Sequence, residues 1–196
     1  ALRIYESMQA ENKTAKMYTN LGIIYKIAQN YPKAISYYRQ AVAIRLKYGS
    51  VKSLIPPFFN LNELYHFMED HEQALAISQE AMQLAIQFDD VFWQGNCHAM
   101  LIDDYLALDQ VDSAQYHLAR YRAIAEGDDH RMNLANSYAG DVWLAANKPR
   151  EALIHIDKAL SSFKARNNTL RTQEVLLKKS RAHMALAQRE EALVYA

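Results

Sequence analysis

The stretch YTNLGIIY, residues 18–25, decides the fold of this chain. Its residues Tyr18, Leu21, Gly22 and Tyr25 follow the spacing i, i+3, i+4, i+7, which places them on one face of an α-helix. The pattern returns with a period of about forty residues, which is typical of a stack of supersecondary units rather than a closed globule. The repeating columns are Gly22, Asn62, Ile102 and Gly140; Tyr25, Tyr65, Tyr105 and Trp143; and Ala34, Ala74, Ala114, Ala152 and Ala192.

Polar breaks separate the helical stretches. Short breaks within the units fall at 29–32, 69–71, 109–112 and 147–149, and further breaks close the units at 49–50, 89–90, 127–129 and 167–168. Pro32 and Pro149 suit the first turn of a helix, where a missing N–H costs nothing. Each unit is therefore predicted to be helix, tight turn, helix, looser turn. The expected fold class is all-α, a right-handed α-solenoid of tandem helix-turn-helix repeats.

The columns have a packing reason. Two helices approach closely only where one of the facing side chains is small, and the glycine and alanine columns supply such positions. We expect each ring of the Tyr/Trp column to fill the space between neighbouring repeats.

Composition excludes several function classes. Lys plus Arg and Asp plus Glu number 22 each, so the formal net charge is zero. This balance argues against a sequence-independent nucleic-acid binder and against a polybasic membrane surface. The single cysteine, Cys97, excludes an intramolecular disulfide and a thiolate metal cage. No apolar run approaches the ~18 residues that a membrane span needs. The sequence leaves the compartment open, and we favour the cytoplasm.

The repeated pattern resembles that of the tetratricopeptide repeat family. Residues 18–25, followed by Ala34, Tyr38 and Ala41, match the family pattern closely. Asn62, Ile102 and Tyr121 stand where that family usually has small residues. The period is longer than the family minimum, and the resemblance to such long repeats implies a regulatory or sensor segment of a larger bacterial signalling protein.

The register predicts how the chain divides into repeats. The full repeats are residues 15–54, 55–94, 95–132 and 133–172, preceded by the end of another repeat at 1–14 and followed by a truncated one at 173–196. Because the helical pattern is already present at both ends, we expect the chain to be part of a longer protein.

The resemblance implies that the first helix of each repeat lines a concave groove. On each first helix, one line of residues lies roughly 120° around the helix from the core face, and this stripe would then face the groove. Three repeats place an acid at the same position of the stripe: Glu63, Asp103 and Asp141. The candidate partner-binding residues are Lys16, Lys26, Phe59, Glu63, His66, Asp103, Leu106, Asp141 and Leu144. Acids beside apolar residues favour a basic or amphipathic peptide. The alternative is a solvated acidic face without a ligand.

The predicted function is a non-catalytic protein-interaction scaffold. Self-association into a homodimer is one alternative, because incomplete solenoid ends expose apolar surface. A chaperone adaptor is another, although only Asn60 fits the carboxylate clamp that the resemblance implies for such proteins. No nucleic-acid or membrane partner is expected.

No catalytic, cofactor or metal site is predicted. The seven histidines form no His-x-x-x-His pair and have no cysteine partner set. Cys97 and His98 are neighbours in sequence and point about 100° apart on a helix. Glycine-rich phosphate loops and Gly-x-Ser-x-Gly are absent from the sequence.

Overall fold

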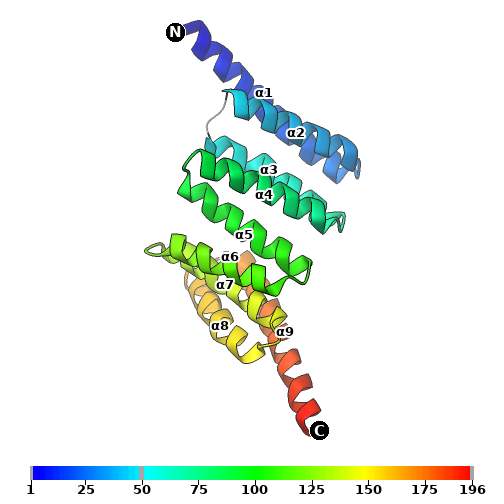
Figure 1. Ribbon diagram of the computed structural model, residues 1–196, viewed down its shortest axis with the longest axis vertical. Helices are drawn as coiled ribbons and strands as arrows, with labels where there is room; N and C mark the ends of the chain where they lie inside the picture. Colours follow the sequence, from blue (N-terminus) through cyan, green and yellow to red (C-terminus); the bar gives the residue numbers. More distant parts are fainter. Residues whose placement is uncertain (1, 49–50, 195–196) are drawn as a thin grey trace. The chain divides into compact units, whose positions relative to one another are not determined.

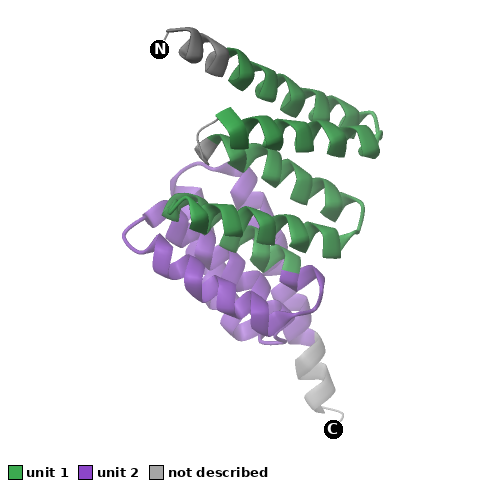
Figure 2. Cartoon of the chain, turned by 45° about the horizontal axis from the view of Figure 1, so that its top comes forward, with its two compact units in different colours: residues 1–104 green, residues 105–196 purple. Residues whose placement is uncertain are grey.

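The computed structural model describes the backbone of residues 2–48 and 51–194 and the side chains of residues 10–48 and 53–187. In this part of the chain the secondary structure is α-helical, with one short 3-10 helix and no strand. The chain divides into two compact units, residues 1–104 and 105–196, coloured separately in Figure 2. The all-α prediction is therefore confirmed.

Unit 1 contains α1 (Leu2–Ile27), α2 (Tyr31–Tyr48), the 3-10 helix η1 (Val51–Leu54), α3 (Ile55–Phe67), α4 (His71–Gln87) and most of α5 (Val91–Ala107). The last turn of α5 belongs to unit 2, with α6 (Val111–Ala125), α7 (Asp129–Ala145), α8 (Pro149–Ala165) and α9 (Thr169–Val194).

The helices are arranged as successive hairpins (Figure 1). In unit 1, α1 packs against α2 and α3 against α4, and the first helices α1 and α3 also touch each other. In unit 2, α7 packs against α8, and the first helices α7 and α9 are in contact. Within each unit, the first helices of successive repeats therefore lie next to one another, as tandem helix-turn-helix repeats require.

Within the described residues, six turns between helices each have one non-glycine residue in the left-handed conformation, and the α6–α7 turn has Gly127 there instead. The non-glycine residues with positive φ are Gln29, Glu69, Asp89, Asp109, Asn147 and Asn167, all between 52° and 59°. In the α3–α4 turn, the Asp70 amide donates to the Tyr65 carbonyl and the Glu69 amide donates to the His66 carbonyl, 3.0 Å each. This double closure satisfies carbonyls that the helix end would leave without partners.

Replacing Glu69 by glycine is expected to stabilise the protein. Glu69 has a φ of 59°, and the left-handed region costs a side-chain-bearing residue about 1–2 kcal/mol. Glycine avoids that cost but loses part of the gain to backbone entropy, leaving an increase of about 0.5–1 kcal/mol in the free energy of unfolding. Urea denaturation followed by circular dichroism measures it. Asn167→Gly is the control and should gain less, because asparagine tolerates this conformation. A loss of stability in Glu69→Gly would contradict the assignment.

The helix boundaries differ from the predicted repeats in two respects. First, α1 runs without a turn from Leu2 to Ile27, across the predicted repeat boundary between residues 14 and 15. Second, α5, α7 and α9 begin at Val91, Asp129 and Thr169, ahead of the boundaries predicted at 95, 133 and 173.

Capping explains the early helix starts. The Asp90 carboxylate accepts a hydrogen bond from the Trp93 amide at 2.8 Å, and Asp128 accepts from the amides of His130 and Arg131. These carboxylates satisfy free N–H groups of the first turn, so each helix starts at its cap and not at the first apolar column. The predicted break at 49–50 and the side chain of Ala192 lie outside the described residues.

At the column of small residues, a small side chain on one helix faces a large side chain on the other helix of the hairpin. A Cβ added to Gly22 would lie 2.3 Å from Cε1 of Tyr38, and one added to Gly140 would lie 2.6 Å from Cγ1 of Ile156. Asn62, at the equivalent position of the second repeat, faces the small Ser78 and donates to its Oγ at 3.0 Å. A large residue on one helix is therefore matched by a small one on the other.

Two rings of the aromatic column stack on rings of the second helix of their own hairpin. The ring of Tyr25 stacks on Tyr37 of α2, with centroids 5.3 Å apart and planes at 13°. In unit 2, Tyr105 stacks on His117 of α6 at the same centroid distance and 11°. These rings are half-buried and pack within their own hairpin. Each ring stands at the end of a first helix and reaches across its own turn, and Tyr25 also packs against the core cluster of unit 1.

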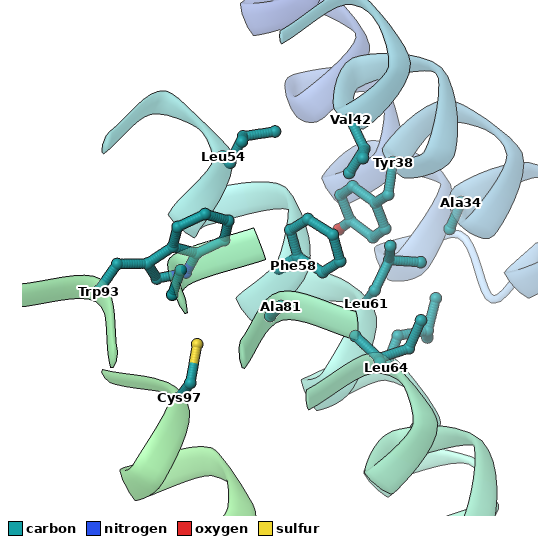
Figure 3. Close-up of a cluster of buried hydrophobic side chains, with 12 residues drawn as sticks. Ala34, Tyr38, Val42, Leu54, Phe58, Leu61, Leu64, Ala81, Trp93 and Cys97 are labelled. Atoms are coloured by element: carbon teal, nitrogen blue, oxygen red, sulfur yellow. The ribbon is translucent and has the colours of Figure 1, made fainter. Parts of the chain in front are cut away.

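The core of unit 1 is one hydrophobic cluster drawn from four helices and η1. Figure 3 shows Tyr38 and Val42 of α2 beside Phe58 and Leu61 of α3. Trp93 of α5 belongs to the same cluster and is 1% exposed. None of the helices in the described residues combines the length and the apolar character needed to cross a membrane.

Candidate functional site

The predicted groove residues lie on the first helices of the hairpins. Lys16 and Lys26 lie on α1, Phe59, Glu63 and His66 on α3, Asp103 and Leu106 on α5, and Asp141 and Leu144 on α7. The side chains of Lys16, Phe59, Glu63 and Asp103 are exposed, and the others are half-buried. Thr19 and Ser137 of the same stripes are buried, so the predicted stripe is only partly a surface.

In unit 1, Glu63 on the first helix of the second repeat forms an ion pair with Lys26 on the first helix of the first repeat. Lys26 Nζ of α1 lies 2.5 Å from Glu63 Oε2 of α3. This ion pair joins successive repeats and offsets the charge of Glu63. Its energetic contribution is small, because half of the Glu63 side chain is exposed and exposed pairs contribute about 0–1 kcal/mol.

In unit 2, Asp141 forms the same kind of link. Its carboxylate accepts a short hydrogen bond from Lys178 of α9, and Lys178 also donates to the Ser137 hydroxyl at 2.8 Å. Burial raises the pKa of Asp141, while the Lys178 ammonium acts in the opposite direction. Two of the three acids are thus matched by lysines of a neighbouring first helix and do not form an uncompensated negative row.

Three predicted residues meet in one pocket of unit 2. Leu106, Asp141 and Leu144 line a hollow of about 510 Å³. The remaining lining residues are Ala107, Ala145, Arg181 and Ala185. Its walls are largely aliphatic, and its charged groups are the Arg181 guanidinium and the lysine-paired carboxylate of Asp141. Such a hollow has the character of a side-chain binding site: an apolar pocket with a few polar groups.

Lys178 and Arg181 were missed because the last segment departs from the repeat pattern. A lysine 37 positions from an acid recurs in both units, as Lys26 with Glu63 and Lys178 with Asp141. The signal that could have found Lys178 is this near-period spacing of opposite charges, combined with contact between successive first helices.

A buried polar cluster lies behind the predicted groove in unit 1. Asp104 is fully buried, and its Oδ1 accepts hydrogen bonds from Asn62 Nδ2 at 2.7 Å and from His66 Nε2 at 2.6 Å. Asn62 Nδ2 also lies 3.0 Å from Ser78 Oγ. Asn62 therefore breaks the small-residue column because it solvates a buried carboxylate, and buried charges require such partners.

His66 is a member of this cluster and not a freely solvated groove residue. The hydrogen bond to Asp104 raises the pKa of His66, with further contributions from the charges of Asp104 and Asp103, while burial opposes the change. On its other side, His66 Nδ1 lies 3.3 Å from His71 Nδ1. The sequence pattern pointed to neither Asp104 nor His71.

Cys97 has the environment of a core residue. Burial raises the pKa of its thiol to about 12, with a smaller contribution from Asp90. A thiol in this state stays protonated near neutrality and is a poor nucleophile. Among the residues whose side chains are described, no group of three His, Cys, Asp or Glu could hold a metal ion.

Comparison with known proteins points to one family. Residues 14–47 match the family model described as Tetratricopeptide repeat. No curated protein sequence matches the chain.

Solved structures share the fold over most of the chain. The TPR-like repeats described as those of a Podosopora anserina kinesin light chain align over 93% of this chain and 91% of that chain, with 17% identity and a TM-score of 0.66. A single-substitution variant of that protein gives a TM-score of 0.68. BtubC (BKLC) from P. vanneervenii aligns over 95% and 92%, with 12% identity and a TM-score of 0.64. Residues 14–47 thus match a tetratricopeptide repeat, and the chain as a whole has the fold of the TPR-like repeats in these solved structures.

Proposed function

We propose that this chain is a non-catalytic interaction domain that binds an amphipathic peptide segment along its first helices. The observation that carries the proposal is the pocket of unit 2, where Leu106 and Leu144 form an aliphatic wall beside Arg181. An apolar anchor in such a pocket, flanked by polar contacts, is how helical and extended peptides dock on helical scaffolds.

The charges around this pocket favour an acidic neighbour to the anchor. Lys178 and Arg181 contribute two positive charges, and Asp141 contributes one negative charge that already contacts Lys178. The expected ligand is thus an amphipathic segment with an aliphatic residue next to Asp or Glu, and not a simply basic one. In unit 1, the proposal gives α1, α3 and α5 a contact surface of their own, made of Phe59, Glu63, Lys16, Lys26 and Asp103.

Short peptides with a central leucine flanked by glutamate, lysine or serine test the proposal by fluorescence anisotropy. We expect the glutamate peptide to bind most tightly. Leu144→Glu should weaken its binding by about tenfold or more, a loss of about 1.4 kcal/mol, because it places a charge in the aliphatic wall. Ile154→Glu is the matched control, since Ile154 lies on the second helix α8 and is 58% exposed. Equal binding by both variants would refute the proposed pocket.

Self-association is the second candidate function, and one observation favours it. Ile86, Phe88, Val91 and Phe92 surround the α4–α5 turn and are 60, 42, 54 and 52% exposed. Clustered exposed apolar residues of this size are typical of an interface, here with a second copy of the chain. Light scattering of wild type and Phe88→Ser separates the candidates: a wild-type dimer that dissociates in the variant supports self-association, and a wild-type monomer excludes it.

The wider role that we propose is the sensor or regulatory segment of a larger bacterial signalling protein in the cytoplasm. Its support is the resemblance of the long repeats to those of such proteins. The sequence that flanks this segment in the genome tests the role: an adjoining kinase or DNA-binding domain would support it, and a secretion signal would contradict it.

A further inference from the structure

Two imidazole rings face each other across the α3–α4 turn. His66 lies in the last turn of α3, and His71 is the first residue of α4. Their Nδ1 atoms are 3.3 Å apart, and the ring centroids are 5.4 Å apart with planes at 47°. The chain reverses between them through the left-handed residue Glu69, which brings together side chains that a continuous helix would separate.

The cluster behind His66 determines which of its nitrogens is available. An ionised carboxylate only accepts hydrogen bonds, so the 2.6 Å contact with Asp104 Oδ1 places a hydrogen on His66 Nε2. Asn62 donates to the same carboxylate oxygen and holds it in place. This assignment follows from the hydrogen-bond network. In the neutral ring, the lone pair of Nδ1 then faces His71, and one proton is shared between the two Nδ1 atoms.

The spacing of the pair fits a divalent metal ion. Zn²⁺ binds imidazole nitrogen at about 2.0–2.1 Å in tetrahedral geometry, which separates two nitrogen ligands by about 3.3–3.4 Å. The observed separation is 3.3 Å. Ligating histidines usually donate their other ring N–H to a carboxylate, which orients the ring and raises its basicity. Asp104 occupies this position behind His66.

We propose that His66 and His71 form a two-imidazole binding site for Zn²⁺, with water in the remaining coordination positions. Zinc takes the place of the hydrogen between the two Nδ1 atoms, and neutral His71 then carries its hydrogen on Nε2 after exchange with solvent, so that both rings ligate as neutral imidazoles. A quarter of the His66 side chain is exposed, which gives the ion access from solvent. Because no third ligating group converges here among the described side chains, the site is open and retains exchangeable positions.

Titration of the whole chain with zinc chloride, followed by calorimetry, tests the proposal. We expect saturable zinc binding at this site in wild type. His71→Gln should lower the zinc affinity by about tenfold or more. This variant leaves the contacts between His66 and Asp104 in place. His66→Gln should have the same effect. Asp104→Asn keeps both histidine ligands but removes the carboxylate that supports His66. Its zinc affinity should be lower than that of wild type by about 10–100-fold.

His183→Gln is the matched control, because His183 is an exposed histidine on α9 outside the pair. It should bind zinc like wild type. Circular dichroism verifies that each variant folds, and His71→Gln carries the test if the substitution of His66 or Asp104 disturbs the core. Zinc affinity that is unchanged in folded His71→Gln, or no saturable binding by wild type, would overturn the proposal and leave the 3.3 Å contact as a hydrogen bond alone.

Discussion

Replacing Trp93 by alanine is expected to lower the free energy of unfolding by about 3–5 kcal/mol, the range for truncating a fully buried large aromatic residue. The Trp93 side chain is 1% exposed, and its ring lies 6.0 Å from that of Phe58 between centroids. It belongs to the cluster of Figure 3, which also contains Leu54 and Cys97. Truncation removes apolar contacts from α3, η1 and α5 together and leaves a cavity that these helices cannot fill without moving.

The neighbouring Phe92 provides the control. It lies on the same helix as Trp93, but 52% of it is exposed. Phe92→Ala should change the stability by no more than about 0.5 kcal/mol, as exposed substitutions usually do. Chemical denaturation measured by circular dichroism compares the two variants. Equal losses would show that α5 is rotated relative to its position in the described core.

Replacing Gly22 by alanine is expected to destabilise the protein by about 1–3 kcal/mol, the usual cost of overpacking. At a solvent-exposed position of a helix, replacing glycine by alanine would be stabilising by about 1 kcal/mol. At Gly22, we expect the cost of the packing clash to exceed this gain in helix propensity. The added Cβ would lie 2.3 Å from Cε1 and 2.5 Å from Cδ1 of Tyr38. Tyr38 is fully buried, so the clash cannot be relieved by moving its ring into solvent.

A double-mutant cycle separates this clash from other effects. Tyr38→Leu removes Cε1 and Cζ, two of the three atoms that the new methyl group would meet, so Gly22→Ala should cost less in that background, with a coupling energy of about 0.5–3 kcal/mol. Asn20→Ala, at an exposed position of the same helix, controls for helix propensity and should be neutral or stabilising. Strict additivity of the Gly22 and Tyr38 substitutions would contradict close packing of α1 on α2.

The repeat pattern predicts what is local. Helices, turns and the buried face of each helix follow from apolar spacing and from the residues at the breaks, as in the Gly22 and Ala34 columns. Helix starts were less accurate, because a cap such as Asp90 acts before the first apolar column. The same pattern also brought Leu106, Asp141 and Leu144 to one pocket, since equivalent positions of successive repeats lie on adjacent first helices.

Partners across repeats were not predictable in this way. The links of Lys26 with Glu63 and of Asn62 with Asp104 join residues 37 and 42 positions apart. Periodicity specifies which face of a helix is buried, but it does not specify which side chain of the next repeat that face meets. A shift of the packing by one helical position would replace every such partner.

By itself, the sequence determined the helical repeats, their turns and the columns of small residues, because these depend on backbone preferences and on burial of one face per helix. Only the tertiary structure decided where the charges and imidazoles meet. It paired two of the three predicted groove acids with lysines, buried Asp104 beside Asn62, and set His66 against His71 across a turn. These contacts depend on distances of a few ångströms between separate helices, which packing sets and periodicity does not encode.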